Sequence, residues 1–157
     1  MKRSDITKLV IAILIPLALG AIAGRFTAQA VPEWFASLNR PSFSPPNWIF
    51  GPVWTVLYIL LGISLFLIWK QIPSKERNNA LWIFSVQMFL NFIWSFVFFY
   101  FNQIGLALVV IISLWFSIVF MLISFYKIKP HAAYLNMPYL LWVTFASILN
   151  AGYFILN

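Results

Sequence analysis

The 157-residue chain contains no cysteine, and charged residues make up only 8% of it. The missing cysteines exclude disulfides, thiolate nucleophiles and cysteine-ligated metals. The only acidic residues are Asp5, Glu33 and Glu76, and each lies near a terminus or in an expected loop. They are therefore not placed to act as the paired carboxylates of a glycosidase. None is expected at membrane depth, where a carboxylate would relay protons or couple an ion.

Other conventional chemistry is also missing from the sequence. His131 is the only histidine, and we expect it in a short turn at the edge of the last helix. There is no glycine-rich phosphate loop, metal-ligand spacing or nucleophile-base pair. We therefore predict no metal site. The net charge of +7 comes from loop residues, and we expect no nucleic-acid partner.

What the chain has in abundance is apolar sequence, since 63% of its residues are hydrophobic. This composition is typical of an integral membrane protein. A bilayer-spanning helix needs about 20 residues, and the uncharged runs provide five. We predict an all-α integral membrane protein in which residues 1–157 form a single domain, a bundle of five transmembrane helices. The expected spans are Ile6 to Thr27, Trp48 to Trp69, Asn79 to Phe101, Gly105 to Tyr126 and His131 to Leu156, with a tight hairpin at Asn102, Gln103 and Gly105.

The basic residues predict the orientation of the bundle. All but two of the ten lysines and arginines fall on one side of the predicted spans, and only Arg25 and Arg40 fall on the other. The positive-inside rule places the N-terminus in the cytoplasm and the C-terminus outside. With no organelle-targeting extension in the sequence, we expect a multi-pass protein of a bacterial plasma membrane.

The first hydrophobic run has an alternative interpretation. Lys2 and Arg3, the apolar stretch after them and Ala28-Gln29-Ala30 are similar to the three regions of a cleavable signal peptide. The run is long for a signal, however. Its Gly20-x-x-x-Gly24 pattern offers a small-residue face for packing within the bundle or between chains. The intact mass of the purified protein distinguishes the two.

Aromatic and amide side chains recur on shared helix faces. Trp54 and Tyr58 lie one turn apart, with Gly51 one turn earlier. The remaining positions follow the same spacing: Gln87, Asn91 and Ser95 on the third span, flanked by Trp94 and Phe98, and Tyr139, Trp142, Ala146 and Asn150 on the fifth. Amides in hydrocarbon seek partners, so we expect these faces to point inward. They would either line a ligand cavity or hold the helices together.

The loop before the second span is rich in proline. Pro45-Pro46 predicts stiff, extended backbone, and Pro52 fits the first turn of the following helix. The loop carries the aromatic residues Trp34, Phe35, Phe43 and Trp48. We expect a lid over the outer mouth of the bundle, flanked by Arg25 and Arg40, which would receive ligand carboxylates.

Several ordered motifs extend over nearly the whole chain. They are strongest in Trp34-Phe35-x-x-Leu38-x-Arg40-Pro41, Pro45-Pro46-x-Trp48 and Phe50-Gly51-Pro52-Val53-Trp54-x-x-Leu57-Tyr58, and continue in Leu61-Gly62, Asn91-x-x-Trp94-Ser95-x-x-Phe98-Phe99 and Pro138-Tyr139-Leu140-x-Trp142-x-x-Phe145-Ala146-x-x-Leu149-Asn150. By these motifs the chain resembles the TspO/MBR family, which comprises tryptophan-rich sensory proteins and the mitochondrial translocator protein, also known as the peripheral-type benzodiazepine receptor.

The resemblance implies a receptor or sensor that binds tetrapyrroles such as protoporphyrin IX in a tryptophan-rich pocket under the first loop. Isoquinoline-carboxamide and benzodiazepine-type ligands, membrane lipid and a homodimeric partner are also implied. The implied ligand-binding residues are Trp34, Phe35, Arg40, Pro45, Trp48, Gly51, Trp54, Tyr58, Asn91, Trp94, Tyr139, Trp142, Phe145, Ala146 and Asn150. Trp54 and Trp142 are the implied catalytic residues of a light-dependent porphyrin degradation, with porphyrin as ligand or substrate and no other cofactor.

The sequence also departs from the family pattern. Positions 35 and 43 are Phe where relatives often have Tyr and Trp, and the C-terminus lacks the aromatic-basic pattern associated with sterol binding. Two other functions fit the residues: a facilitative transporter of porphyrins or other hydrophobic molecules, and a structural protein with a sealed aromatic core.

Overall fold

The structure is a computed structural model that describes residues 3–157, and 86% of the chain is helical. Five segments are long and apolar enough to span a membrane, which confirms the predicted bundle: Arg3–Phe35, Asn47–Trp69, Lys75–Tyr100, Ile104–Ile128 and Pro130–Leu156. The elements in chain order are α1 (Arg3–Ala30), η1 (Val31–Phe35), η2 (Asn47–Ile49), α2 (Phe50–Trp69), α3 (Lys75–Ser95), η3 (Phe96–Tyr100), α4 (Ile104–Ile128), α5 (Pro130–Tyr134) and α6 (Met137–Leu156).

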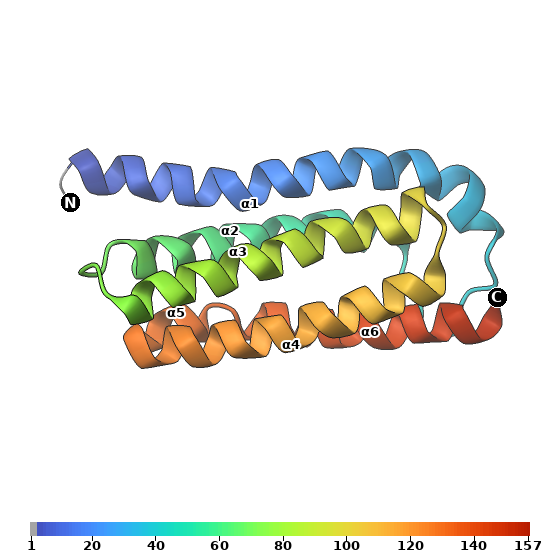
Figure 1. Ribbon diagram of the computed structural model, residues 1–157. Helices are drawn as coiled ribbons and strands as arrows, with labels where there is room; N and C mark the ends of the chain where they lie inside the picture. Colours follow the sequence, from blue (N-terminus) through green and yellow to red (C-terminus); the bar gives the residue numbers. More distant parts are fainter. Residues whose placement is uncertain (1–2) are drawn as a thin grey trace.

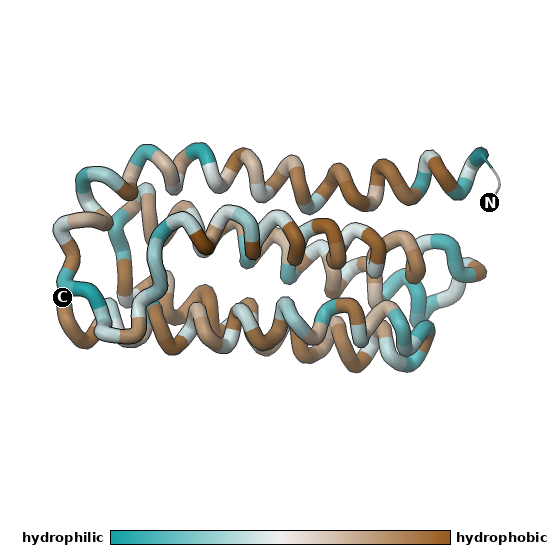
Figure 2. The backbone as a smooth tube through the Cα atoms, turned by 180° about the vertical axis from the view of Figure 1, so that it is seen from behind, coloured by the Kyte–Doolittle hydropathy of each residue, from teal (hydrophilic) through white to brown (hydrophobic). Residues whose placement is uncertain are grey.

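The helices run lengthwise beside one another, with the two termini at opposite ends of the bundle (Figure 1). We call these the N-terminal end and the C-terminal end. Helix α1 packs mainly on α2, α3 on α4, and α4 on α6. Apolar residues cover most of the helix length, and polar residues gather at the two ends (Figure 2). This distribution suits a bundle with lipid around its sides.

Local sequence explains several helix boundaries. The side chain of Ser74 caps α3, accepting a 3.1 Å hydrogen bond from the backbone N–H of Arg77. Asn102 has a positive φ of 56° and forms the predicted turn between η3 and α4. Pro46 is extended, with φ −57° and ψ 141°, and Pro52 lies in the first turn of α2. The extended backbone at Pro46 and the place of Pro52 agree with the sequence-based expectation.

The fifth span differs from the continuous helix that the sequence predicted. It is divided into α5 and α6, and the break falls at Leu135 and Asn136. The fully buried Asn136 donates from Nδ2 to Oγ of Ser64 at 2.6 Å and to the carbonyl of Ala132 at 2.9 Å. Pro138 has no N–H to continue the helical ladder. Together they explain why a new helix begins here.

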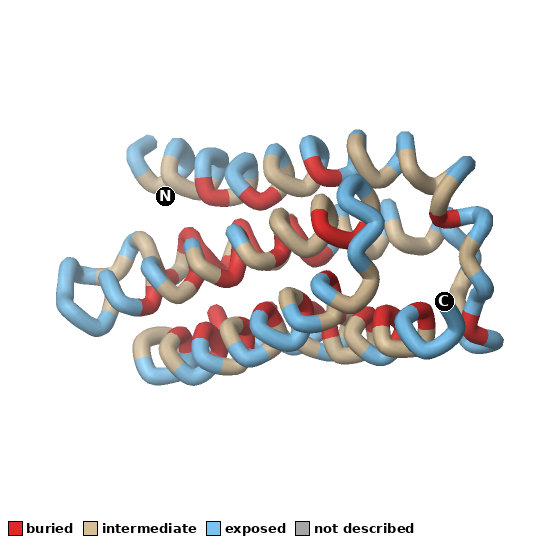
Figure 3. Tube along the Cα trace, turned by 45° about the vertical axis from the view of Figure 1, so that its right-hand side comes forward, coloured by how far each residue is buried: buried red, intermediate tan, exposed pale blue. Residues whose placement is uncertain are grey.

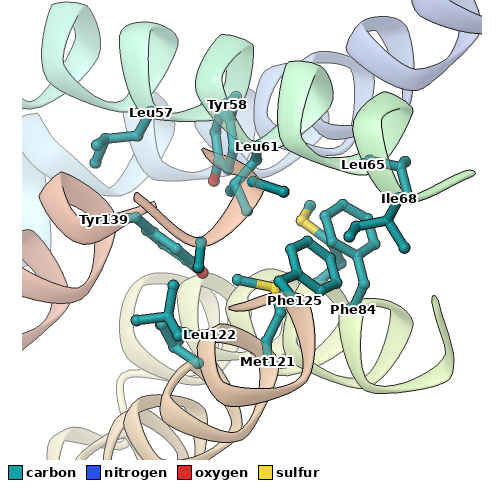
Figure 4. Packing of buried hydrophobic residues seen from close by; sticks show 14 of the residues in the cluster. Leu57, Tyr58, Leu61, Leu65, Ile68, Phe84, Met121, Leu122, Phe125 and Tyr139 are labelled. Carbon is teal, nitrogen blue, oxygen red and sulfur yellow. The ribbon is translucent and has the colours of Figure 1, made fainter. Parts of the chain in front are cut away.

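The bundle is tightly packed in its N-terminal half. Burial is concentrated on the inward faces of the helices (Figure 3). The core between α2, α3 and α4 includes Leu65, Phe84 and Phe125 (Figure 4). The rings of Phe84 and Phe125 stack with centroids 6.3 Å apart and planes 8° apart. This half of the bundle therefore holds the helices in place for the more open half.

Glycines set how closely α1 approaches α2. A Cβ on Gly62 would meet the Cα of Ile13 and would lie 2.8 Å from the carbonyl oxygen of Ala12, so the two backbones touch. A Cβ on Gly20 would overlap the ring of Tyr58. Beyond this point, a Cβ on Gly24 would meet no neighbour within 4 Å. The Gly20-x-x-x-Gly24 face thus turns toward α2 within the chain, and α1 separates from α2 past Gly20.

Candidate functional site

A cavity of about 720 Å³ occupies the C-terminal half of the bundle, where α1 and α2 separate. Its walls come from α1, α2, the end of α3 with η3, and α6. The lining residues are Leu17, Gly20, Ala21, Ala23, Gly24, Thr27, Ala28, Val31, Phe35, Asn47, Phe50, Gly51, Trp54, Thr55, Tyr58, Trp94, Ser95, Phe98, Phe99, Ala146, Leu149, Asn150 and Tyr153. No lysine, arginine, histidine or acid is among them.

The walls of the cavity differ in character. Helix α1 contributes mostly small side chains, so its wall is smooth and close to the backbone. The opposite walls are aromatic. Trp54 and Tyr58 stack with ring centroids 5.4 Å apart and planes 27° apart, which confirms that they share one face of α2. Trp94 packs against Phe98 with centroids 5.8 Å apart. A flat apolar molecule would find π-faces on one side and close backbone on the other.

A buried polar network lies behind the Tyr58 ring. The Tyr58 hydroxyl donates to Oδ1 of Asn91 at 2.8 Å, and Nδ2 of Asn91 donates to the Tyr139 hydroxyl at 3.1 Å. Tyr139 in turn donates to Oε1 of Gln87 at 2.9 Å. The predicted polar stripe of the third span therefore faces the interior. It links α2, α3 and α6 directly beneath the cavity.

A second amide holds the far wall. Asn150 accepts from Nε1 of Trp94 at 3.0 Å and donates to the carbonyl of Ile104 at 3.0 Å. Both polar atoms of the amide are thus engaged with neighbouring elements. The contact fixes the Trp94 indole, which lines the cavity, in one orientation.

The loop of residues 36–46 lies at the C-terminal end of the bundle, between the cavity residues Phe35 and Asn47. Arg40 donates from Nη2 to Oγ of Ser44 at 3.2 Å, to the carbonyl of Pro45 at 3.0 Å and to Oδ1 of Asn47 at 3.2 Å. The Ser44 hydroxyl lies 3.2 Å from the hydroxyl of Tyr153 on α6. In this structure Arg40 is therefore occupied in holding the loop together, whereas the sequence suggested that it faces a ligand.

The predicted site residues occupy three kinds of position. The cavity lining includes Phe35, Gly51, Trp54, Tyr58, Trp94, Ala146 and Asn150. Asn91, Tyr139, Trp142 and Phe145 stand behind the lining: the first two in the polar network and the last two packed on each other with centroids 5.5 Å apart. Trp34, Arg40, Pro45 and Trp48 belong to the loop and its flanks, and Trp48 is 73% exposed.

Trp142 lies on the other side of α2 from the cavity. It lines a shallow hollow between α2 and α6 with Pro52, Val53, Val56, Leu57, Pro138 and Leu141. Its ring meets Phe50, a cavity residue, with centroids 5.7 Å apart. The indole nitrogen is buried and has no hydrogen-bond partner among residues 3–157. Trp142 thus reaches the cavity through Phe50.

The α1 wall of the cavity was not predicted from the sequence. One row of its lining positions recurs every three or four residues, at Leu17, Gly20, Gly24 and Thr27, and continues at Val31 in η1. The signal was present in Gly20-x-x-x-Gly24, whose small residues predict a packing face but do not by themselves indicate a cavity wall. On α6, Tyr153 was not predicted either, although it lies one turn beyond the Ala146 to Asn150 stretch.

The site offers binding groups and no conventional catalytic group. Within the described range 3–157, no cluster of histidine, cysteine or acidic side chains is arranged to hold a metal ion. The polar atoms in the walls are hydroxyls and amides. What the arrangement can do is enclose and orient a flat hydrophobic molecule against indole and phenyl rings.

The fold and the cavity define a class of protein: a multi-pass helical membrane protein with an aromatic-walled cavity under its first loop. The family model described as TspO/MBR family matches residues 12–156. The chain belongs to this family, as its sequence motifs indicated.

Named relatives cover most of the chain. The tryptophan-rich protein TspO of Archaeoglobus fulgidus is 42% identical over 154 residues, 98% of this chain and 99% of the relative. The translocator protein of Homo sapiens is 35% identical over 136 residues, 85% of this chain and 80% of the relative. The tryptophan-rich sensory protein of Cereibacter sphaeroides is 31% identical over 133 residues, 85% of this chain and 82% of the relative.

Proposed function

We propose that the protein is a membrane receptor for tetrapyrroles, with protoporphyrin IX as the representative ligand, and that the ligand binds in the cavity between α1 and α2. The observation that carries the proposal is the aromatic-walled cavity of about 720 Å³. This volume lies within the range of about 300–1,000 Å³ that is usual for small-molecule sites. Isoquinoline-carboxamide and benzodiazepine-type molecules are flat and hydrophobic too, and belong to the same ligand class.

The chemistry of the walls supports a flat aromatic ligand. The macrocycle would stack against the Trp54 and Tyr58 pair, because offset contact between π-systems is favourable. The small residue at Gly24, where a Cβ would meet nothing within 4 Å, allows the opposite face of the ring to approach the α1 backbone. Propionate groups would point to the C-terminal end, where Arg25 follows Gly24 on α1 and Asn47 lines the cavity.

A light-dependent step fits the same site. A photoexcited porphyrin transfers energy to dissolved oxygen, and the reactive oxygen species then attacks the macrocycle or a nearby indole. Such chemistry belongs to the porphyrin, while the protein supplies binding, orientation and oxidisable side chains. We propose Trp54 as the indole in direct contact. Trp142 supports the cavity wall through its 5.7 Å contact with Phe50.

Localisation and assembly are part of the proposal. The basic residues near the N-terminal end favour a cytoplasmic N-terminus and a C-terminus outside, in a bacterial plasma membrane. A homodimer is the proposed assembly, and analytical ultracentrifugation in a density-matched detergent measures it. A transporter of porphyrins is the competing role, and it predicts net porphyrin flux across proteoliposomes.

The test is a titration of protoporphyrin IX into purified, detergent-solubilised protein in the dark, followed by tryptophan fluorescence. Saturable, stoichiometric quenching that weakens in Trp54→Ala supports the cavity. Quenching that does not saturate and is the same in the variant means that porphyrin only partitions into the micelle, and the proposal fails. Illuminating the same samples then tests degradation, and full activity in both Trp54→Phe and Trp142→Phe would remove the proposed roles of the two indoles.

A further inference from the structure

The cavity is open on one side, and that side faces the position of the bilayer. The exposed lining residues of the two helices are Ala21, Gly24 and Ala28 on α1 and Gly51 and Thr55 on α2, and Asn47 of η2 is exposed at the C-terminal end. All five helix residues are small. We call the gap between these two rows the lateral opening.

The lateral opening follows from how α1 and α2 diverge. The two backbones touch at Gly62 and remain close at Gly20, which packs on the Tyr58 ring. One turn further along α1, a Cβ on Gly24 would meet nothing within 4 Å, and the same holds for Gly51 on α2. The small side chains therefore face open space where the helices separate. Larger residues here would close the cavity against lipid.

The other possible route into the cavity leads past the loop at the C-terminal end. Several contacts hold this loop to α6. The backbone N–H of Asn39 donates to Oδ1 of Asn157 at 2.9 Å, and Nδ2 of Asn157 donates back to the carbonyl of Asn39 at 3.1 Å. We call this pair of hydrogen bonds the clasp. Positions 41 and 43 lie against α6, because a Cβ on Gly152 would come within 2.8 Å of the Pro41 ring and 3.3 Å of the Phe43 ring.

Beneath the loop, aromatic rings pack on one another. Phe35 is buried and meets Tyr153 with ring centroids 5.2 Å apart. Phe98 meets Tyr153 with centroids 6.1 Å apart. At the C-terminal end, the loop and the rings of Phe35, Phe98 and Tyr153 thus leave Asn47 as an exposed lining residue, while the side between α1 and α2 is lined by small residues, mostly alanine and glycine.

We infer that the cavity exchanges its ligand with the bilayer through the lateral opening between α1 and α2. This inference rests on the proposed function, and it specifies the ligand class: a hydrophobic molecule already dissolved in the membrane. The loop at the C-terminal end, held to α6, hinders exchange with water. Such a protein samples the porphyrin content of the membrane and not that of the aqueous phase.

The kinetics of binding test the route. The protein is reconstituted in liposomes, and association and dissociation of protoporphyrin IX are followed by stopped-flow tryptophan quenching in the dark. Gly51→Leu and Gly24→Leu narrow the opening from its two sides. Two variants are used so that the route can still be tested if one of them misfolds. Because a narrower passage slows movement in both directions, we expect kon and koff each to fall by about fivefold or more. Damage to the cavity wall alone would raise koff, so an increased koff in both variants overturns the inference.

Two controls separate the routes. Ser113→Leu places the same side chain on the lipid-facing side of α4, away from the cavity, and is expected to leave both rates unchanged. Asn157→Ala removes the clasp on the loop, with loosening verified by hydrogen exchange. If the ligand passes through the loop, this variant speeds both rates while Gly51→Leu does not slow them, and the inference is wrong.

A last arm varies the lipid composition, so that the partition coefficient of the porphyrin changes at a fixed aqueous concentration. By the lateral route, the association rate is expected to rise and fall with the porphyrin concentration in the bilayer. Association that follows only the aqueous porphyrin concentration contradicts the lateral route. Failure of the proposed function looks different, since the wild type then shows no saturable quenching at all.

Discussion

Tyr58 and Asn91 join helix α2 to helix α3 through a 2.8 Å hydrogen bond directly under the cavity. The ring of Tyr58 also stacks on Trp54 and packs on Gly20 of α1. One side chain therefore forms the floor of the cavity and ties three helices together. A substitution of Tyr58 is therefore expected to affect both the stability of the bundle and the shape of the cavity.

Loss of the Asn91 amide is expected to destabilise the bundle. Asn91→Leu leaves the hydroxyls of Tyr58 and Tyr139 without their shared partner in a buried setting. Hydrogen bonds between transmembrane helices contribute about 0.6 kcal/mol on average and up to about 1.7 kcal/mol. A double-mutant cycle of Asn91→Leu with Tyr58→Phe, monitored by unfolding in detergent, is expected to give a coupling energy within that range.

The matched control for this cycle is Ser85→Ala on the same helix. Ser85 is exposed and bonds only the carbonyl of Leu81 in its own helix. It is expected to leave stability nearly unchanged. A coupling energy of zero between Asn91 and Tyr58 would mean that the network positions the rings without stabilising the fold.

Gly62 is expected to tolerate no side chain. A Cβ there would lie 2.8 Å from the backbone oxygen of Ala12, and backbone atoms cannot turn aside as a side chain can. Gly62→Leu would force α1 away from α2, and overpacking of this kind costs about 1–3 kcal/mol. The measurement is the midpoint of thermal unfolding in detergent. Gly24→Ala is the comparison, because its Cβ meets nothing within 4 Å and alanine favours helix. Equal destabilisation by both variants would contradict the proposed close approach at Gly62.

The sequence predicted the spans and the inward polar faces well, for identifiable reasons. Charged residues are costly in hydrocarbon, so the long uncharged runs, such as those that end before Lys70 and before Lys127, mark where the chain crosses. Gln87 and Asn91 lie four residues apart in an apolar helix, which leaves the interior as their only favourable position. Both are buried in the structure.

The cavity depends on the distances between helices. These distances cannot be read from the spacing of residues along each helix. Trp54 and Trp142 have the same side chain and similar apolar neighbours, yet one lines the cavity and the other lies beyond α2. That difference depends on how α2 and α6 are turned toward one another, which residue spacing within each helix does not contain. Likewise Gly62 and Gly24 are both glycines on the facing sides of α2 and α1. Gly62 lies where the two helices touch and Gly24 lies where they have separated, and the sequence alone does not distinguish the two positions.

Trp54 and Trp142 are expected to contribute unequally to ligand affinity. Trp54 lines the cavity and stacks on Tyr58, whereas Trp142 contacts the cavity residue Phe50 from behind. Removing a directly stacked indole is expected to raise the Kd for protoporphyrin IX by about tenfold or more, and removing Trp142 by about two- to threefold, since buried aromatic area dominates such contacts. Parallel titrations of Trp54→Ala and Trp142→Ala measure this. Equal losses, or a larger loss for Trp142→Ala, would place Trp142 in direct contact with the ligand.

The Asn39 and Asn157 clasp is expected to restrain the loop of residues 36–46 without supporting the fold. The Asn157 side chain exchanges hydrogen bonds of 2.9 Å and 3.1 Å with the Asn39 backbone at the exposed end of the bundle. Exposed hydrogen bonds of this kind contribute little to global stability, yet they suppress local opening. Asn157→Ala is therefore expected to raise amide hydrogen exchange in the loop by about threefold or more while leaving the unfolding midpoint unchanged.

The control for the clasp is Thr7→Ala, which removes a comparable exposed hydrogen bond to the Arg3 carbonyl at the other end of α1 and should leave the loop unaffected. If exchange in the loop of Asn157→Ala stays at the wild-type level, then the Arg40 contacts with Ser44, Pro45 and Asn47 are sufficient to hold it. The clasp would then have no part in closing the cavity to water.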